Sequence, residues 1–123
     1  MDRPRVAMVE DNPDNRLLVQ AILRDRYQVV EYATGQDALD GFAQARPDVV
    51  LLDISLPGMD GTEVLERMRQ DPGLADVPVI ALTAHALEED RGRYLAVGFD
   101  GYVTKPILDE TFLLEAIADA VRS

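Results

Sequence analysis

Hydrophobic positions follow two alternating patterns along the whole length of this chain. The first pattern is a short run in which nearly every residue is apolar, which predicts a strand buried on both faces of a parallel sheet. Such runs occupy five segments of the sequence: Arg5–Glu10, Gln28–Tyr32, Val49–Asp53, Val79–Thr83 and Gly101–Thr104. The second run alternates more strongly between apolar and polar residues, so we expect that strand nearer an edge of the sheet.

The second pattern lies between these runs and has apolar residues at the spacing of an amphipathic helix. The predicted helices extend from Asn12-Pro13 to about Arg26, from about Gln36 to Ala45, from about Thr62 to Gln70, from about Leu87 to Val97, and from about Asp109 onward. Asn12 is expected to cap the first helix and Gly98 to end the fourth. This alternation predicts an α/β fold with a doubly wound parallel sheet, and the length predicts a single domain over residues 1–123.

Composition and charge narrow the classes of function. The 23 acidic residues outnumber the 12 basic ones and give a net charge of -11, which disfavours direct binding to nucleic acid and otherwise favours solubility. The chain contains no cysteine, which excludes a disulfide framework, a thiol nucleophile and a zinc ribbon. No apolar run approaches the roughly 20 residues of a membrane span, and there is no secretory signal pattern, so we expect a cytoplasmic protein.

Polar residues end or directly follow four of the predicted strands. Glu10 and Asp11 close the first strand, Asp53 ends the third, Thr83 ends the fourth and Lys105 follows the fifth. Because ligands of open parallel sheets sit beyond the carboxyl ends of the strands, we expect these side chains to converge on one pocket. Three carboxylates, a hydroxyl and an ammonium group together indicate a site for a divalent cation and a phosphoryl group.

Each of these residues also has a purely structural interpretation. Glu10 and Asp11 could simply favour the N-terminus of the following helix, although adjacent acids also suit Mg²⁺. Asp53 could be a cap or an Asx-turn residue that opens the next loop, rather than a nucleophile for phosphorus. Thr83 could cap the helix after it, and Lys105 could be solvated. For each residue alone, the structural interpretation is as good as the functional one or better. Only the occurrence of these residues together at neighbouring strand ends favours the functional interpretation.

Three further positions have competing interpretations. His85 is the only histidine, and in a chain without cysteine it makes a weak transition-metal site, so a solvated loop position is favoured. Tyr102 is expected to pack in the core, and the alternative is a rotating side chain that reports the state of the pocket. The bond between Lys105 and Pro106 could be cis, which would aim the lysine back at the pocket.

A set of motifs in this order resembles the receiver domain of two-component response regulators. The motifs are Glu10-Asp11, Asp53, the segment Leu56–Gly61, Thr83 and Lys105-Pro106, and the resemblance covers essentially the whole chain. It implies a flavodoxin-like (βα)5 fold with strand order 2-1-3-4-5. It also implies a phospho-accepting signalling switch, similar to chemotaxis regulators, that either stands alone or forms the receiver of a hybrid kinase or larger regulator.

The resemblance assigns a role to each acidic residue of the pocket. Asp53 would accept a phosphoryl group from the phosphohistidine of a histidine kinase or a histidine phosphotransfer protein. Asp11, Asp53 and the backbone carbonyl of Ser55 would bind Mg²⁺ directly, and Glu10 would act mainly through a metal-bound water. The chain would then catalyse only its own phosphorylation and dephosphorylation, and would not be an enzyme acting on a separate substrate.

The same resemblance implies how the signal leaves the pocket. Lys105 and Thr83 would contact the phosphoryl oxygens, and Tyr102 would turn inward when Thr83 moves. This movement would alter the surface of the fourth helix, fifth strand and fifth helix for a downstream protein partner. The protein would be a monomer or a phosphorylation-dependent dimer. In similar proteins, the residues at the positions of Ser55 and His85 tune how long the phosphoryl group survives.

Two other classes of function compete with this switch. A small-ligand binding module of the same architecture, such as a flavin carrier, would want a glycine-rich phosphate loop after the first strand, where Glu10–Pro13 is acidic instead. A phosphatase that works through an aspartyl-phosphate would need a second acid two residues after its nucleophile, where this chain has Ser55. Treatment with acetyl phosphate and Mg²⁺ would separate the three classes.

Overall fold

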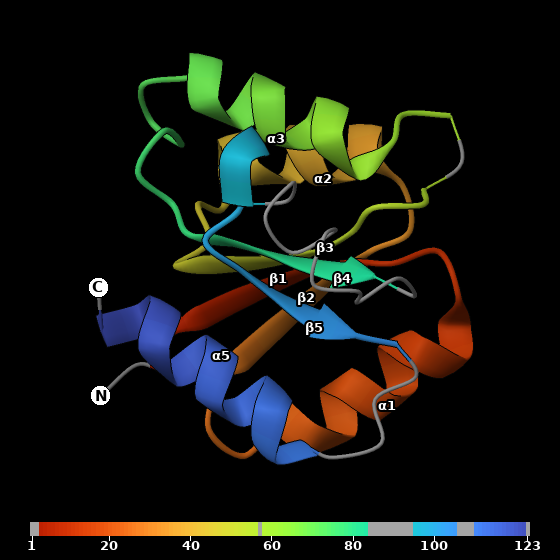
Figure 1. Ribbon diagram of the computed structural model, residues 1–123. Coiled ribbons are helices and arrows are strands. Elements are labelled where there is room, and N and C mark those ends of the chain that lie inside the picture. Colours follow the sequence, from red (N-terminus) through yellow and green to blue (C-terminus); the bar gives the residue numbers. More distant parts are fainter. Residues whose placement is uncertain (1–2, 57, 84–94, 106–109, 123) are drawn as a thin grey trace.

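A twisted sheet of five parallel strands separates two layers of helices in the computed structural model of the chain, which describes residues 3–56, 58–83, 95–105 and 110–122 (Figure 1). The strands are β1 (Arg5–Val9), β2 (Gln28–Tyr32), β3 (Val49–Asp53), β4 (Val79–Thr83) and β5 (Gly101–Thr104). Their spatial order is β2-β1-β3-β4-β5, and every neighbouring pair is parallel. The predicted doubly wound α/β fold and its strand order are therefore confirmed.

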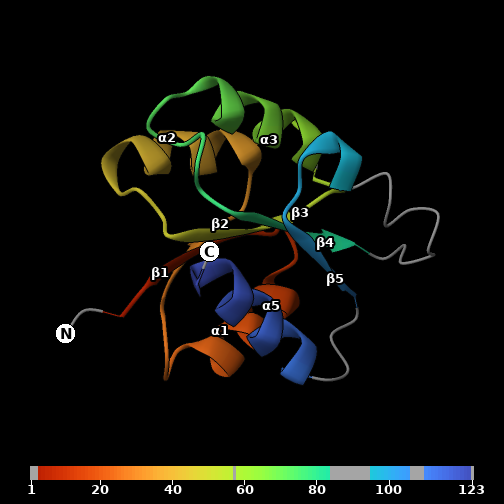
Figure 2. The same cartoon turned by 60° about the vertical axis from the view of Figure 1, so that its left-hand side comes forward.

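Helices cover both faces of the sheet. They are α1 (Pro13–Leu23), α2 (Gly35–Gln44), α3 (Gly61–Gln70) and α5 (Glu110–Arg122). Figure 2 shows α2 and α3 together on one face of the sheet and α1 and α5 together on the other. Most of the fourth predicted helix lies outside the described residues, and its described part, residues 95–97, is helical. Within the described ranges, no helix is both long enough and apolar enough to cross a membrane.

The boundaries of the elements agree with the sequence pattern to within about one residue, except at the end of α1. Strand β1 ends at Val9, one residue before the predicted end, although the Glu10 N–H still donates to the carbonyl of Tyr32 at 3.0 Å. Helix α1 ends at Leu23 instead of near Arg26, because the Arg26 N–H donates to the Leu23 carbonyl at 3.0 Å in a tighter turn. This turn starts the chain back towards β2.

Local signals fix where the helices begin and end. Side-chain oxygens of Asn12, Thr34 and Asp60 each accept a hydrogen bond from a backbone N–H in the first turn of α1, α2 and α3, respectively. These bonds satisfy donors that the helix itself leaves unpaired. Gly98 follows the helical residues 95–97 and has a φ of 121°, a backbone conformation that only glycine adopts readily. The predicted roles of Asn12 and Gly98 are thus both confirmed.

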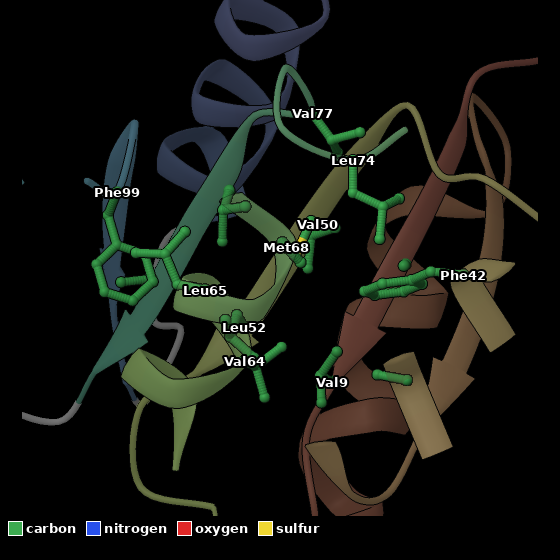
Figure 3. Close-up of a cluster of buried hydrophobic side chains, with 14 of the residues drawn as sticks. Val9, Phe42, Val50, Leu52, Val64, Leu65, Met68, Leu74, Val77 and Phe99 are labelled. Atoms are coloured by element: carbon green, nitrogen blue, oxygen red, sulfur yellow. The ribbon is translucent and has the colours of Figure 1, made fainter. Parts of the chain in front are cut away.

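The hydrophobic core is split by the sheet into two clusters, one under each helical layer. Figure 3 shows part of the cluster beneath α2 and α3, to which Phe42 of α2, Leu65 and Met68 of α3, and Val50 and Leu52 of β3 all belong. All the residues of β3 and β4 are buried, whereas β2 is only partly covered, as expected for an edge strand. A fully buried leucine or valine stabilises a fold by roughly 1.5–3 kcal/mol, so the two central strands are strongly fixed in position.

Candidate functional site

The carboxyl ends of β3, β4 and β5 are aligned by the register of the sheet. Asp53 pairs with Leu82 at the end of β3, and Thr83 pairs with Thr104 at the end of β4. The Lys105 N–H continues this ladder by donating to the Thr83 carbonyl at 2.7 Å. The residues predicted to form the site therefore leave the sheet at one common edge, which is the edge where α/β proteins bind ligands.

Lys105 joins two buried carboxylates at this edge. Its Nζ donates to Oδ2 of Asp53 at 2.9 Å and to Oε2 of Glu10 at 3.3 Å. The side chains of Glu10 and Asp53 are 0% and 3% exposed, and that of Lys105 is 18% exposed. Buried carboxylates are costly unless a cation and hydrogen bonds compensate them, so the ammonium group is needed where it lies.

Backbone N–H groups hold the remaining oxygens of the two carboxylates. The Ser55 N–H donates to Oδ1 of Asp53 at 2.9 Å, and the Asn12 N–H donates to Oε1 of Glu10 at 3.1 Å. The first bond is an Asx-turn, so the structural interpretation of Asp53 holds alongside the functional one. With one oxygen on a backbone donor and the other on Lys105, the Asp53 carboxylate is held in one orientation.

Burial and charge perturb the titration of this cluster. Burial is the main cause that raises the pKa of Glu10, and the neighbouring Asp53 adds to it, although the Asn12 N–H and Lys105 act in the opposite direction. Burial alone would lower the pKa of Lys105, but the hydrogen bond and charge of Asp53, together with Glu10, outweigh it and raise that pKa. Lys105 is therefore firmly protonated, and the carboxylates are crowded enough to benefit from a further cation.

Three carboxylates at this edge could hold a metal ion. Glu10, Asp11 and Asp53 each offer one oxygen, and these oxygens all lie within 4.8 Å of one another. Asp11 is exposed, whereas the other two are buried, so the cluster opens to solvent on the side of Asp11. An all-oxygen set of this kind fits Mg²⁺ and does not suit softer metals. The carbonyl of Ser55 as a further ligand stays a prediction.

Thr83 and Tyr102, the two residues predicted to carry the signal out of the pocket, both lie within the described part of the chain. Thr83 is buried at the end of β4, and Tyr102 pairs with Ala81 inside the sheet and packs, half-buried, on the cluster beneath α2 and α3. The expected core packing of Tyr102 is thus confirmed. His85, the predicted helix start after Thr83, and the geometry of the bond before Pro106 lie outside the described residues.

Two residues shape the site without having been singled out in the sequence. Arg16 donates to the backbone carbonyl of Glu10 at 2.7 Å and pairs with Glu31 at 3.4 Å. Gly61 begins α3 so close to β3 that a Cβ atom there would lie 2.6 Å from the carbonyl oxygen of Asp53. The turn-rich segment Ser55–Gly61 predicted a loop, but only the folded chain shows this close approach.

Known proteins are similar to this chain over most of its length. The family model of the response regulator receiver domain matches residues 6–118. The sensor protein GacS of Pseudomonas syringae pv. syringae is 42% identical over 108 residues, which cover 85% of this chain but only 12% of GacS. The polar-differentiation response regulator DivK of Brucella anthropi is 37% identical over 109 residues, covering 88% of this chain and 89% of DivK.

A solved structure with a metal ion is also similar. The receiver domain of sensor histidine kinase PA1611 from Pseudomonas aeruginosa superimposes with a TM-score of 0.88 at 34% identity, covering 98% of this chain and 99% of that one. That structure has a magnesium ion coordinated in its active-site cleft. The acidic cluster found here lies in the same fold.

Proposed function

The chain belongs to the response regulator receiver domain family of two-component signalling, and on that premise we propose that it is a phospho-accepting switch whose acceptor is Asp53. The observation that carries this proposal is the 2.9 Å contact between Lys105 Nζ and Asp53 Oδ2, next to the acidic cluster at the carboxyl edge of the sheet. A buried carboxylate with its own cation and a metal-compatible neighbourhood is suited to attack phosphorus.

The proposed transfer uses few groups of the chain. A carboxylate oxygen of Asp53 attacks the phosphorus of a phosphohistidine, an O–P bond forms, and the P–N bond breaks with its electron pair returning to the imidazole. The Ser55 N–H holds the carboxylate in place, and Lys105 compensates the negative charge of the phosphoryl oxygens. Asp11, Asp53 and the Ser55 carbonyl would hold Mg²⁺, with Glu10 acting through water, and the bound ion would neutralise charge on the phosphoryl group.

The proposed output follows from the neighbours of this site. Thr83 would donate its hydroxyl to a phosphoryl oxygen, and Tyr102 would then turn into the space beside β5. The surface formed by the segment between β4 and β5, by β5 and by α5 would change with it. In this proposal the chain turns over no separate substrate, and it catalyses only its own phosphorylation and dephosphorylation.

The proposed partners are a histidine kinase or histidine phosphotransfer protein and a downstream protein, with transfer taking place in the cytoplasm. The relatives include two architectures, since DivK is matched over 89% of its length and GacS over 12% of its length. Both a single-domain regulator and a receiver within a hybrid kinase are compatible with the site. The switch would act as a monomer or through a phosphorylation-dependent dimer.

Mass spectrometry after treatment with acetyl phosphate and Mg²⁺ tests the proposal. We expect one phosphoryl group on the wild-type chain and none on Asp53→Asn, whereas Asp25→Asn, which removes an exposed acid elsewhere, is labelled normally. Full labelling of Asp53→Asn would overturn the assignment. Continuous release of phosphate would favour a phosphatase, and no reaction at all would favour a binding module.

A further inference from the structure

Asp11 differs from the other two acids of the carboxylate cluster in how its side chain is held. Glu10 and Asp53 each accept hydrogen bonds from a backbone N–H and from the ammonium group of Lys105. The Asp11 carboxylate is exposed and accepts no hydrogen bond from the described residues. Its oxygen nevertheless lies within 4.8 Å of an oxygen of each of the other two carboxylates, so the backbone around Asp11 sets its position.

Arg16 holds the backbone immediately before Asp11. Its Nη1 donates to the carbonyl oxygen of Glu10 at 2.7 Å, and a bond from a charged donor is stronger than one between neutral groups. Because a peptide unit is planar, fixing this oxygen also fixes the nitrogen and the Cα atom of Asp11, which lie in the same plane. Loss of the guanidinium would therefore release the peptide unit that carries Asp11.

Two adjacent residues of β2 fix this arrangement in turn. Arg16 Nε lies 3.4 Å from Oε1 of Glu31, and the two side chains are 22% and 38% exposed. The carbonyl of Tyr32, the next residue of the strand, accepts a hydrogen bond from the Glu10 N–H at 3.0 Å. The guanidinium and the residue that it contacts are thus tied to the same strand, so their contact has little freedom to shift.

We propose that Arg16 is a positioning residue for Mg²⁺: through the carbonyl of Glu10, it keeps the Asp11 carboxylate beside the other two acids for binding the ion. The inference rests on the proposed function, since Asp11 is a proposed ligand of Mg²⁺. Groups that orient a metal ligand without touching the metal change its affinity by about 10–100-fold when they are removed.

The positive charge of Arg16 makes the sign of the effect informative. A guanidinium close to the cluster repels a cation that binds there. Charge alone therefore predicts tighter Mg²⁺ binding when Arg16 is replaced by a neutral residue. Positioning of Asp11 predicts the opposite, because the loss of an oriented ligand weakens binding.

Titration of Mg²⁺ into the ¹⁵N-labelled full chain, followed by its amide signals, measures this sign. We expect Arg16→Met to lower the affinity by about tenfold, and Arg16→Lys, whose ammonium group still donates to the Glu10 carbonyl, to recover part of the loss. Arg67→Met is the control, since it removes the same charge from an arginine–glutamate pair on the surface of α3 and should change the affinity only slightly. Unchanged or tighter binding in Arg16→Met would overturn the proposal.

A double-mutant cycle tests whether Arg16 acts through Asp11. In the Asp11→Ala background, Arg16→Met should cause little further loss of affinity, because no carboxylate remains to be positioned. Equal losses in both backgrounds would show that Arg16 affects the metal site by another route, and would also overturn the proposal. The cycle compares variants that share the Arg16 substitution, so a general loss of stability in Arg16→Met does not imitate the expected result.

Labelling with acetyl phosphate separates this inference from the proposed function. Arg16→Met should need more Mg²⁺ for half-maximal labelling but should reach the wild-type rate at saturating Mg²⁺, because Asp53 and Lys105 are unchanged. A lower rate at saturation with an unchanged Mg²⁺ requirement would refute the positioning role and leave the switch intact. Absence of labelling in the wild type would refute the phospho-accepting switch, whereas the Mg²⁺ affinities would still decide the role of Arg16.

Discussion

The ammonium group of Lys105 lies 2.9 Å from Oδ2 of Asp53, although 52 positions separate the two residues in the chain. Lys105 is the only lysine of the sequence, and every other cationic side chain except His85 is arginine. A compact ammonium fits between Asp53 and Glu10, whereas a planar guanidinium with five donors needs more room. The contacts between Lys105 and the two buried carboxylates thus depend on the only ammonium side chain in the sequence.

Replacing Lys105 by methionine should destabilise the fold, because it leaves two buried carboxylates without their cation. Loss of one partner from a fully buried pair costs about 3–5 kcal/mol, and we expect about 2 kcal/mol here because the Lys105 side chain is 18% exposed. Lys105→Arg should restore only part of the loss. Unfolding in urea measures these differences.

Arg67→Met is the matched control for that measurement. Arg67 pairs with Glu63 on the surface of α3, where the two side chains are 54% and 48% exposed, so its loss should cost only about 0.3–0.5 kcal/mol. Adding Asp53→Asn and Glu10→Gln to Lys105→Met should recover stability. Equal losses for Lys105→Met and Arg67→Met would show that the ion pair at the site is not structurally important.

Removing Asp11 should weaken Mg²⁺ binding while leaving the fold intact. Asp11 is the exposed member of the carboxylate cluster, so its loss removes one oxygen ligand and also reduces repulsion among the acids. We expect Asp11→Ala to lower the affinity for Mg²⁺ on the order of tenfold or more, and to be at least as stable as the wild type without metal. Calorimetric titration and urea unfolding check the two parts.

Asp14→Ala is the control for this prediction. Asp14 carries the same charge three residues later, in the first turn of α1, and does not belong to the cluster. Its removal should change the affinity for Mg²⁺ only slightly, through long-range charge. An unchanged affinity in Asp11→Ala, or an equal loss in both variants, would exclude Asp11 as a ligand.

Much of this architecture could be predicted because the strands that position the site are its most apolar segments. Runs such as Val49–Asp53 and Val79–Thr83 are buried over their whole length, and the polar residue at the end of each run marked the edge where ligands bind. The end of α1 was predicted too late. Residues 24–26 are charged and would fit the exposed last turn of a helix, but the backbone turns after Leu23 through a hydrogen bond that the pattern does not encode.

Contacts between distant segments outside the predicted site were beyond sequence reasoning. Arg69 donates to the carbonyls of Ala75 and Val77 at 2.9 and 2.7 Å and to Asp100 at 3.0 Å, which ties the end of α3 to the segments before β4 and β5. In the sequence, Arg69 is one of two arginines in the last turn of a charged helix. Such through-space bonds depend on how α3 docks on the sheet, and local patterning carries no information on that docking.

Asp60 should stabilise the fold in a pH-dependent way. Hydrogen bonds from the Thr62 hydroxyl at 2.6 Å and the Glu63 N–H at 3.0 Å lower the pKa of Asp60. A carboxyl whose pKa is lowered by folding contributes stability above its unfolded pKa, and loses it as the pH falls through the folded pKa. Asp60→Ala should therefore cost about 1 kcal/mol at neutral pH and less below about pH 3.8.

Asp60→Asn separates the charge from the cap. Its amide oxygen still accepts a hydrogen bond at the start of α3, so the loss of stability at neutral pH should be smaller than in Asp60→Ala. Urea unfolding of the three proteins at neutral and acidic pH checks both statements. A difference between wild type and Asp60→Ala that stays the same at all pH values would contradict a stabilising role of the ionised carboxylate.

Phosphorylation should change the neighbourhood of β4 and β5 more than the rest of the fold. Thr83 is buried at the end of β4, and Tyr102 on the adjacent strand β5 pairs with Ala81, which lies two positions before Thr83. A phosphoryl oxygen is a strong, charged acceptor for the Thr83 hydroxyl, and a movement of Thr83 would leave space that Tyr102 can fill. Two such arrangements need differ by only a few kcal/mol for a ligand to select between them.

Hydrogen exchange with and without beryllofluoride, a phosphoryl mimic, measures this change. We expect altered protection between residues 84 and 104, and Thr83→Val, which keeps the shape but removes the hydroxyl, should abolish most of it. Asp53→Asn, which removes the acceptor carboxylate, should show no change with the mimic. Altered protection confined to α1 and α2, with residues 79–104 unchanged, would rule out the coupling of Thr83 to Tyr102 and would indicate an output surface on the opposite edge of the sheet.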